Sequence, residues 1–177
     1  ALFKAGLKEL APRHDLTATF MAKWNTDLPG CSGHIHQSLI APDGANAFSD
    51  GDGGFSDTAR HYLGGLLNLM PATTVFFCPT INSYKRAVPG VWSPINIGWG
   101  IENRTTAVRA IPGNASSATR LECRVPGADA NPHLALAVSL ASGLYGISER
   151  LEPPDAVTGN AYEDAALPTL PSNLDHA

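Results

Sequence analysis

The sequence is poor in charge and has no long apolar run. Charged residues make up 16% of its 177 residues and hydrophobic residues 44%, a balance that favours a packed core over disorder. Acidic residues outnumber basic ones by 16 to 12, which gives a net charge of −4. Proteins that grip a nucleic-acid backbone usually carry a basic surplus, so no nucleic-acid partner is expected. No apolar run approaches the roughly 20 residues that cross a bilayer, so no membrane partner is expected either.

Cysteine is also scarce. Cys31, Cys78 and Cys123 are odd in number and widely spaced, which argues against a disulfide framework and favours a cytoplasmic location. The first residues are too short an apolar stretch, and too interrupted by Lys and Glu, to form a signal peptide. The chain starts without Met and ends in a Pro-rich stretch, so we expect it to be a piece of a longer protein.

Local patterns predict both helices and strands. Apolar residues at helical spacing predict helices over 2–11, 56–70 and 131–147, with Ser56 and Asn131 as N-caps. Strands are predicted over 16–24, 31–40, 75–78, 95–102, 104–111 and 120–125. Residues 79–94, with several prolines, predict a long ordered loop of the kind that often carries function.

Two histidines fall on one face of the strand predicted over 31–40. Because alternate residues of a strand share a face, His34, His36 and Ser38 point the same way. Two imidazoles roughly 7 Å apart can bind a metal and a polar ligand group. The alternative is a pair of partly exposed histidines beside a turn.

The same period places Arg120, Glu122 and Arg124 on one face of the strand over 120–125. The carboxylate can hold a divalent metal, and the arginines can hold phosphate or carboxylate through their planar fork. The alternative is an ordinary surface ladder of ion pairs, which would stabilise the fold little.

Five of the twelve basic residues lie within residues 86–124, namely Arg86, Arg104, Arg109, Arg120 and Arg124. Such a gathering of arginines in an acidic protein indicates a small polyanionic ligand, although simple decoration of strand faces is the alternative. Arg104 and Arg109 are five residues apart, so on one regular strand their side chains would point to opposite faces. Both can join one site only if the chain bends or bulges between them. A metal site beside an arginine-rich pocket is the arrangement that phosphoryl transfer requires.

In their order and spacing these motifs resemble the catalytic domain of the glutamine synthetase family, over roughly residues 1–165. The matching segments are Thr19–Lys23, Gly30–Ser38, Asn82–Gly90, Glu102–Arg104 with Arg109, Arg120–Arg124 and Asp129–Pro132. The resemblance implies an α+β fold that is mainly antiparallel sheet with helices packed on one face. Residues 1–152 would form part of that catalytic domain, and residues 153–177 would be a Pro-rich extended segment of it.

The resemblance also implies an ATP-dependent ligase. Members of the family phosphorylate the side-chain carboxylate of glutamate, and ammonia or an amine then displaces phosphate. ATP and two divalent cations, Mg²⁺ or Mn²⁺, are the implied cofactors, and a homo-oligomeric ring is the implied assembly. The family's other metal-binding glutamates would lie upstream, so we expect this chain alone to be inactive.

Family roles can be carried over to matching positions of this sequence. His34 and Glu122 would ligate the metal nearest the ATP phosphates, and His36 and Ser38 would contact the nucleotide. The remaining roles fall on arginines and one glycine. Arg104, Arg109 and Arg120 would hold the phosphates, with Arg104 and Arg109 acting on the transferred phosphoryl group, whereas Arg86, Arg124 and the Gly30 backbone would bind glutamate.

Two positions depart from the family pattern. Pro29-Gly30 replaces the usual Asn-Gly before the histidine strand, and Trp92 occupies the place of a glutamate that receives ammonium in ammonia-using members. An indole cannot attract ammonium as a carboxylate does, and its apolar face suits an organic amine. Trp92 therefore favours the branch that joins glutamate to larger amines. A non-catalytic scaffold related to the family and a metal-dependent amidohydrolase are the alternative hypotheses.

Overall fold

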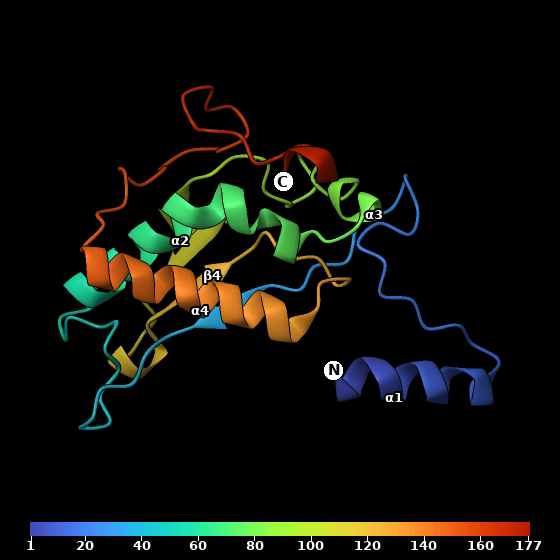
Figure 1. Ribbon diagram of the computed structural model, residues 1–177. Coiled ribbons are helices and arrows are strands. Elements are labelled where there is room, and N and C mark those ends of the chain that lie inside the picture. Colours follow the sequence, from blue (N-terminus) through green and yellow to red (C-terminus); the bar gives the residue numbers. More distant parts are fainter.

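The computed structural model describes all 177 residues and contains one four-stranded sheet with two long helices against one of its faces (Figure 1). The strands are β1 (Ile35–Gln37), β2 (Trp99–Ile101), β3 (Val108–Ile111) and β4 (Arg120–Cys123), in the spatial order β1-β4-β3-β2. β4 pairs antiparallel with both of its neighbours, and β2 and β3 are parallel. The predicted α+β fold with a mainly antiparallel sheet is confirmed.

The register of the sheet aligns the charged residues in one row. His36 pairs with Glu122, Glu122 pairs with Arg109, and Arg109 pairs with Gly100. Directly paired residues project from the same face of a sheet, so three functional groups from three strands share one face. The adjacent row is apolar and faces the core, which includes Ile35, Cys123 and Val108.

The core is closed by helices α2 (Asp57–Phe77) and α4 (Pro132–Glu149), which lie side by side over the sheet (Figure 1). Both begin as predicted, because the side chains of Ser56 and Asn131 accept hydrogen bonds from the first free backbone N–H groups. The helices meet at glycines. A Cβ at Gly65 would overlap the carbonyl oxygen of Ser142, so only glycine allows this close crossing.

Two predicted strands are wrong. Residues 75–77 belong to α2, which continues past Pro71 and ends at Phe77, and Cys78 follows as its C-cap; a short apolar run has the same sequence signal whether it is a strand or a buried helix. Residues 16–24 form no regular element. The Lys23 backbone N–H donates to the Asn82 side chain instead of to a neighbouring strand.

The other strands are shorter than predicted, and the loop over 79–94 contains a short helix, α3 (Ile81–Tyr84). Residues 102–107 turn before β3 begins, and Glu102 adopts a left-handed backbone with φ of 52°. On one regular strand, Arg104 and Arg109 would point to opposite faces. This turn bends the chain between them, so that both side chains reach the same cavity.

The segment 153–177 is irregular, turns at residues 161–167 and ends in a short 3₁₀ helix, Leu174–His176. Its backbone bonds repeatedly to residues 95–99: Val157 N–H donates to Trp99 O at 2.8 Å, and Leu170 N–H donates to Ile95 O at 2.9 Å. The segment thus lies along the edge of the sheet near β2.

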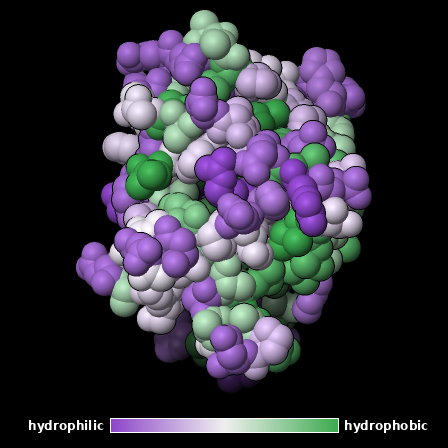
Figure 2. Space-filling view, turned by 90° about the vertical axis from the view of Figure 1, so that its left-hand side faces the viewer, coloured by the Kyte–Doolittle hydropathy of each residue, from purple (hydrophilic) through white to green (hydrophobic).

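Helix α1 (Leu2–Leu10) stands apart from the rest of the molecule in Figure 1 and buries no residue. It continues into a 3₁₀ helix, Ala11–His14, and contacts the rest of the chain through Lys4, whose Nζ donates to Ala130 O at 2.8 Å. The outer side of α4 is also uncovered, with Leu136, Leu140 and Leu144 about half exposed. Hydrophobic residues gather on the right-hand side of Figure 2, where α4 faces outward. None of the helices has the length and apolar character needed to cross a membrane.

Candidate active site

Glu122 on β4 is the centre of the charged row. Its side chain is only 4% exposed, and three groups bind it. Oε1 lies 2.9 Å from His34 Nδ1 and accepts a hydrogen bond from Arg124 Nη1 at 2.9 Å. Oε2 accepts from Arg109 Nη1 at 3.2 Å. A buried carboxylate is stable only with such partners, and here all of its contacts are basic.

This surrounding keeps Glu122 ionised. Burial by itself raises the pKa of the carboxyl group, but the hydrogen bond with His34 and the charge of Arg124 outweigh it and lower the pKa to about 2. Glu122 is therefore a fixed negative charge at neutral pH.

His36 projects beside the same carboxylate and is held by Arg120. Its Nε2 lies 3.9 Å from Glu122 Oε1, and its Nδ1 accepts a hydrogen bond from Arg120 Nε at 3.1 Å. Burial lowers the pKa of His36, and the charge of Arg120 lowers it further against the opposing charge of Glu122. The imidazole is thus neutral at pH 7.

His34 and Glu122 fit a divalent cation as a pair of ligands. Adjacent ligands of an octahedral Mg²⁺ or Mn²⁺ ion lie about 3 Å apart, and His34 Nδ1 and Glu122 Oε1 are 2.9 Å apart. The other ring nitrogen of His34, Nε2, is buried without a hydrogen-bond partner in the chain, and it points away from the Nδ1–Glu122 pair. The chain holds no group of three or more His, Cys, Asp or Glu side chains placed to bind a metal. It therefore offers a partial ligand set.

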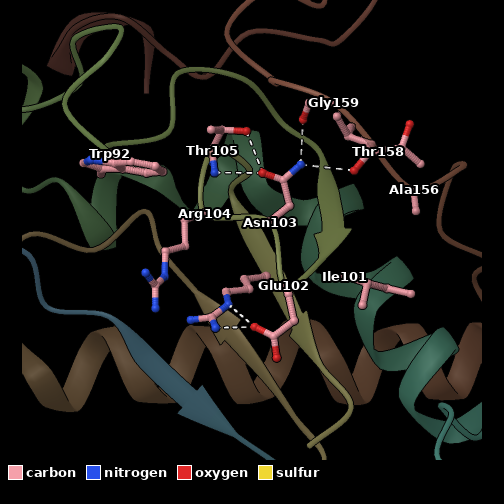
Figure 3. Close-up of a pocket in the computed structure, with 11 residues that line it drawn as sticks. Trp92, Ile101, Glu102, Asn103, Arg104, Thr105, Ala156, Thr158 and Gly159 are labelled. Atoms are coloured by element: carbon pink, nitrogen blue, oxygen red, sulfur yellow. Dashed lines mark hydrogen bonds and ion pairs between the residues drawn. The ribbon is translucent and has the colours of Figure 1, made fainter.

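A cavity of about 700 Å³ opens beside this cluster (Figure 3). Its walls come from the loop at Trp92, the turn after β2, Arg109 of β3 and the segment at residues 156–159. Arg109 also donates to Glu102 through Nε at 2.8 Å, which fixes its guanidinium at the cavity wall. Arg104 lines the same cavity beside Glu102 (Figure 3), and no hydrogen bond engages its guanidinium group.

Trp92 connects the cavity to the carboxylate cluster. Arg124, which binds Glu122 through Nη1, donates through Nη2 to the Trp92 carbonyl oxygen at 2.9 Å. The indole is 61% exposed and borders the cavity. A single side chain, that of Arg124, therefore links Trp92 to the buried carboxylate of Glu122.

Most residues predicted for the site come together. The cluster and cavity unite His34, His36, Trp92, Arg104, Arg109, Arg120, Glu122 and Arg124. Ser38 follows β1, is exposed, and bonds to none of them.

Arg86 and Gly30 form a second, adjoining pair. Arg86 is 5% exposed, and its Nη2 donates to the carbonyl oxygens of Arg124, Val125 and Pro126. A Cβ at Gly30 would meet the Arg86 side-chain stem 2.7 Å away, so glycine is needed for this packing. The geometry gives Arg86 a role in holding the end of β4.

Sequence patterns contain no sign of two features of the site. One is the wall at 156–159, which lies in a segment without periodicity. The other is the role of Asn103, which lies in the Glu102–Arg104 motif but was assigned no function there; its Nδ2 donates to Val157 O at 3.1 Å and Gly159 O at 2.8 Å and so holds that wall in place.

The chain matches the family model described as glutamine synthetase, catalytic domain, over residues 1–177. The chain belongs to the glutamine synthetase family. Among curated relatives, it is 47% identical to a γ-glutamylethanolamide synthetase of Streptomyces coelicolor over 177 residues, which covers 100% of this chain and 37% of that protein. It is 45% identical to a glutamate–isopropylamine ligase of a Pseudomonas species, over 90% of this chain and 35% of that protein.

Solved structures of the glutamine synthetase family agree with this assignment. A structure titled GmaS/ADP complex superposes with a TM-score of 0.88 at 39% identity and covers 99% of this chain and 42% of that one. The chain thus spans well under half the length of these relatives. Family membership confirms the resemblance seen in the motifs and argues against the amidohydrolase hypothesis.

Proposed function

We propose that the protein containing this chain is an ATP-dependent ligase that joins the γ-carboxyl group of glutamate to an organic amine. The observation that carries the proposal is the buried Glu122 cluster next to a cavity bordered by Trp92. The cluster supplies a metal-binding pair and several fixed guanidinium groups, which is what transfer of a phosphoryl group requires. A homo-oligomeric ring is the assembly that family membership suggests.

The proposed reaction has two steps. A γ-carboxylate oxygen of glutamate attacks the γ-phosphorus of ATP, the bond to the β-phosphate oxygen breaks, and ADP leaves. The amine nitrogen then attacks the acyl carbon, the carbon–oxygen bond to phosphate breaks, and the nitrogen gives up a proton. Mg²⁺ or Mn²⁺, when bound, would neutralise phosphate charge.

Within this scheme the residues of the chain have separate tasks. Arg104, Arg109 and Arg120 would hold phosphoryl oxygens, and His36 and Ser38 would contact the nucleotide. Arg124, Arg86 and the Gly30 backbone would bind glutamate, Arg86 through guanidinium nitrogens other than Nη2, which main-chain carbonyls already engage. Support for the first group is that Arg104 and Arg109 line the cavity and that Arg120 is fixed by His36.

The choice of an organic amine rests on Trp92. The indole borders the cavity where a carboxylate would attract ammonium, and two of the curated relatives are named for ethanolamide and isopropylamine products or substrates. An apolar wall favours an alkyl group by the area that it removes from water.

The deciding experiment is turnover by the intact protein with ATP, glutamate and either ethylamine or ammonium, followed as phosphate release and by mass spectrometry of the amide. We expect the kcat/KM for ethylamine to exceed that for ammonium. We expect Trp92→Glu to reverse this order. Higher kcat/KM for ammonium in the unaltered enzyme would refute the role assigned to Trp92.

A matched pair of variants tests the cluster itself. Glu122 and Glu152 each contact a histidine and an arginine, but Glu152 is exposed. Glu122→Gln should lower kcat/KM by about 100-fold or more, because the fixed charge at the phosphoryl site is lost. Glu152→Gln should retain activity, and equal effects of the two changes would contradict the proposed site. If Glu122→Gln and the unaltered enzyme bind ATP but neither forms an amide, the scaffold hypothesis is favoured.

A further inference from the structure

The backbone at Trp92 is strained. Its φ is 59°, in the left-handed region that bulky side chains rarely adopt. Gly90, two residues earlier, also has a positive φ of 81°, so the chain turns sharply at this point. Such a conformation persists only when neighbouring groups hold it, and it is often found where a side chain must be aimed at a ligand.

Two side chains hold this turn through its carbonyl oxygens. Arg124 donates to the Trp92 carbonyl oxygen at 2.9 Å, and the Tyr162 hydroxyl donates to the next carbonyl oxygen, that of Ser93, at 3.1 Å. Ser93 is 2% exposed, so its carbonyl has little access to water as a substitute partner. Arg124 also binds Glu122, whereas the Tyr162 hydroxyl bonds only to this turn.

Tyr162 is itself firmly placed. It follows Ala161, whose N–H donates to Thr105 Oγ1 at 2.9 Å and whose carbonyl accepts from Asn96 Nδ2 at 2.7 Å. Burial raises the pKa of the Tyr162 hydroxyl, and it therefore remains a hydrogen-bond donor at neutral pH. The same segment lines the cavity at residues 156–159, opposite Trp92 in Figure 3.

We infer that Tyr162 is a positioning residue for amine selection: its hydrogen bond to Ser93 fixes the left-handed turn and thereby the place of the Trp92 indole at the cavity. The segment 153–177 thus contributes both a wall of the cavity and the anchor of the wall opposite. This inference rests on the proposed ligase function, because it assigns the cavity to the acceptor amine.

The test compares Tyr162→Phe with Tyr145→Phe in the intact protein. Tyr145 lies on the exposed side of α4 and makes no hydrogen bond through its hydroxyl, so it controls for removal of a tyrosine hydroxyl. With ATP and glutamate saturating, Tyr162→Phe should raise the KM for ethylamine about fivefold, the effect of one lost hydrogen bond. The kcat and the KM for ATP should change less than about twofold, and Tyr145→Phe should match the unaltered enzyme.

A spectroscopic measurement follows the indole directly. The Trp92 contribution to fluorescence anisotropy is obtained by subtracting the signal of Trp92→Phe, in the presence and absence of Tyr162→Phe. We expect this contribution to fall when the Tyr162 hydroxyl is removed, because the indole gains motion.

The two readouts distinguish the possible failures. An unchanged KM for ethylamine in an active Tyr162→Phe enzyme overturns the inference, as does a loss of kcat and thermal stability without a change in that KM. Absence of turnover in the unaltered enzyme with either amine refutes the proposed function. In that case anisotropy still decides the positional claim, and an unchanged Trp92 signal overturns it.

Discussion

Two glutamates show at the scale of single residues how burial decides the role of an ion pair. Glu152 binds Arg60 at 2.7 Å and His61 at 3.0 Å, but its side chain is 55% exposed. Such pairs stabilise a fold by at most about 1 kcal/mol. Glu122 has the same kinds of partner at 4% exposure, where an uncompensated charge would cost several kcal/mol. The partners of Glu122 are therefore indispensable to the fold, whereas the exposed pair is ordinary surface.

Burial also separates the three free thiols. Burial raises the pKa of Cys78 to about 11 and that of Cys123 to about 12, whereas Cys31 is exposed. Since the thiolate is the reactive form, a raised pKa leaves a thiol protonated and unreactive at about pH 8. We predict that a thiol reagent at that pH labels Cys31 alone in the native chain and all three thiols after unfolding. Mass spectrometry counts the labels.

A second variant makes this prediction specific. Cys31→Ser should leave the native chain unlabelled within the time that labels the parent chain. Rapid labelling of Cys78 or Cys123 at a pH far below those pKa values would show that the core opens easily.

At the scale of elements, the crossing of α2 and α4 depends on glycine. A Cβ at Gly65 would overlap Ser142 and Gly146 backbone atoms, which belong to a packed helix and cannot move aside as a flexible side chain can. Gly6 lies in α1 and is exposed, and a Cβ added there would meet no other atom within 4 Å. An added methyl group would therefore collide with backbone atoms at Gly65 and meet open space at Gly6.

We therefore predict opposite signs for the two changes. Gly65→Ala should lower the free energy of unfolding by about 1–3 kcal/mol through overpacking. Gly6→Ala should leave it unchanged or raise it by up to about 1 kcal/mol, because alanine favours a helix. Urea unfolding followed by circular dichroism measures both, and a destabilising Gly6→Ala or a neutral Gly65→Ala would contradict this packing.

At the scale of the whole molecule, two features indicate that this chain alone does not form a complete active site: the small number of possible metal ligands and the uncovered apolar side chains. In the proposed site, His34 and Glu122 would supply two metal ligands where Mg²⁺ takes about six, including waters. Several large apolar side chains on α1 and α4 are uncovered, and the chain spans well under half the length of its relatives.

The isolated 177-residue chain is accordingly predicted to form no γ-glutamyl amide from ATP, glutamate and ethylamine. Product is measured by mass spectrometry against a Glu122→Gln chain as the background. ATP-dependent product above that background would show that the ligands on this chain suffice. Calorimetry of ATP binding with and without Mg²⁺ then tells whether the partial site still binds the nucleotide.

Which residues share a strand face could be predicted from local sequence. The two-residue period placed His34 with His36 and Glu122 with Arg120 and Arg124, because side-chain direction in a strand is a local property. The caps at Ser56 and Asn131 were predictable too, since a helix start needs only a side-chain acceptor within three residues. The family could also be predicted, because the motifs follow one another in the family's order and spacing, which can be read along the sequence.

Which of these faces meet depends on the packing of the whole chain. The pairing of β1, β4 and β3 brings His36, Glu122 and Arg109 into one row, and the pairing of β1 with β4 joins residues 86 positions apart (122 − 36). The burial of Arg86 against main-chain carbonyls and the hydrogen bond from Tyr162 to Ser93 are likewise long-range contacts. Such contacts depend on how loops close and cores pack, which no local spacing encodes.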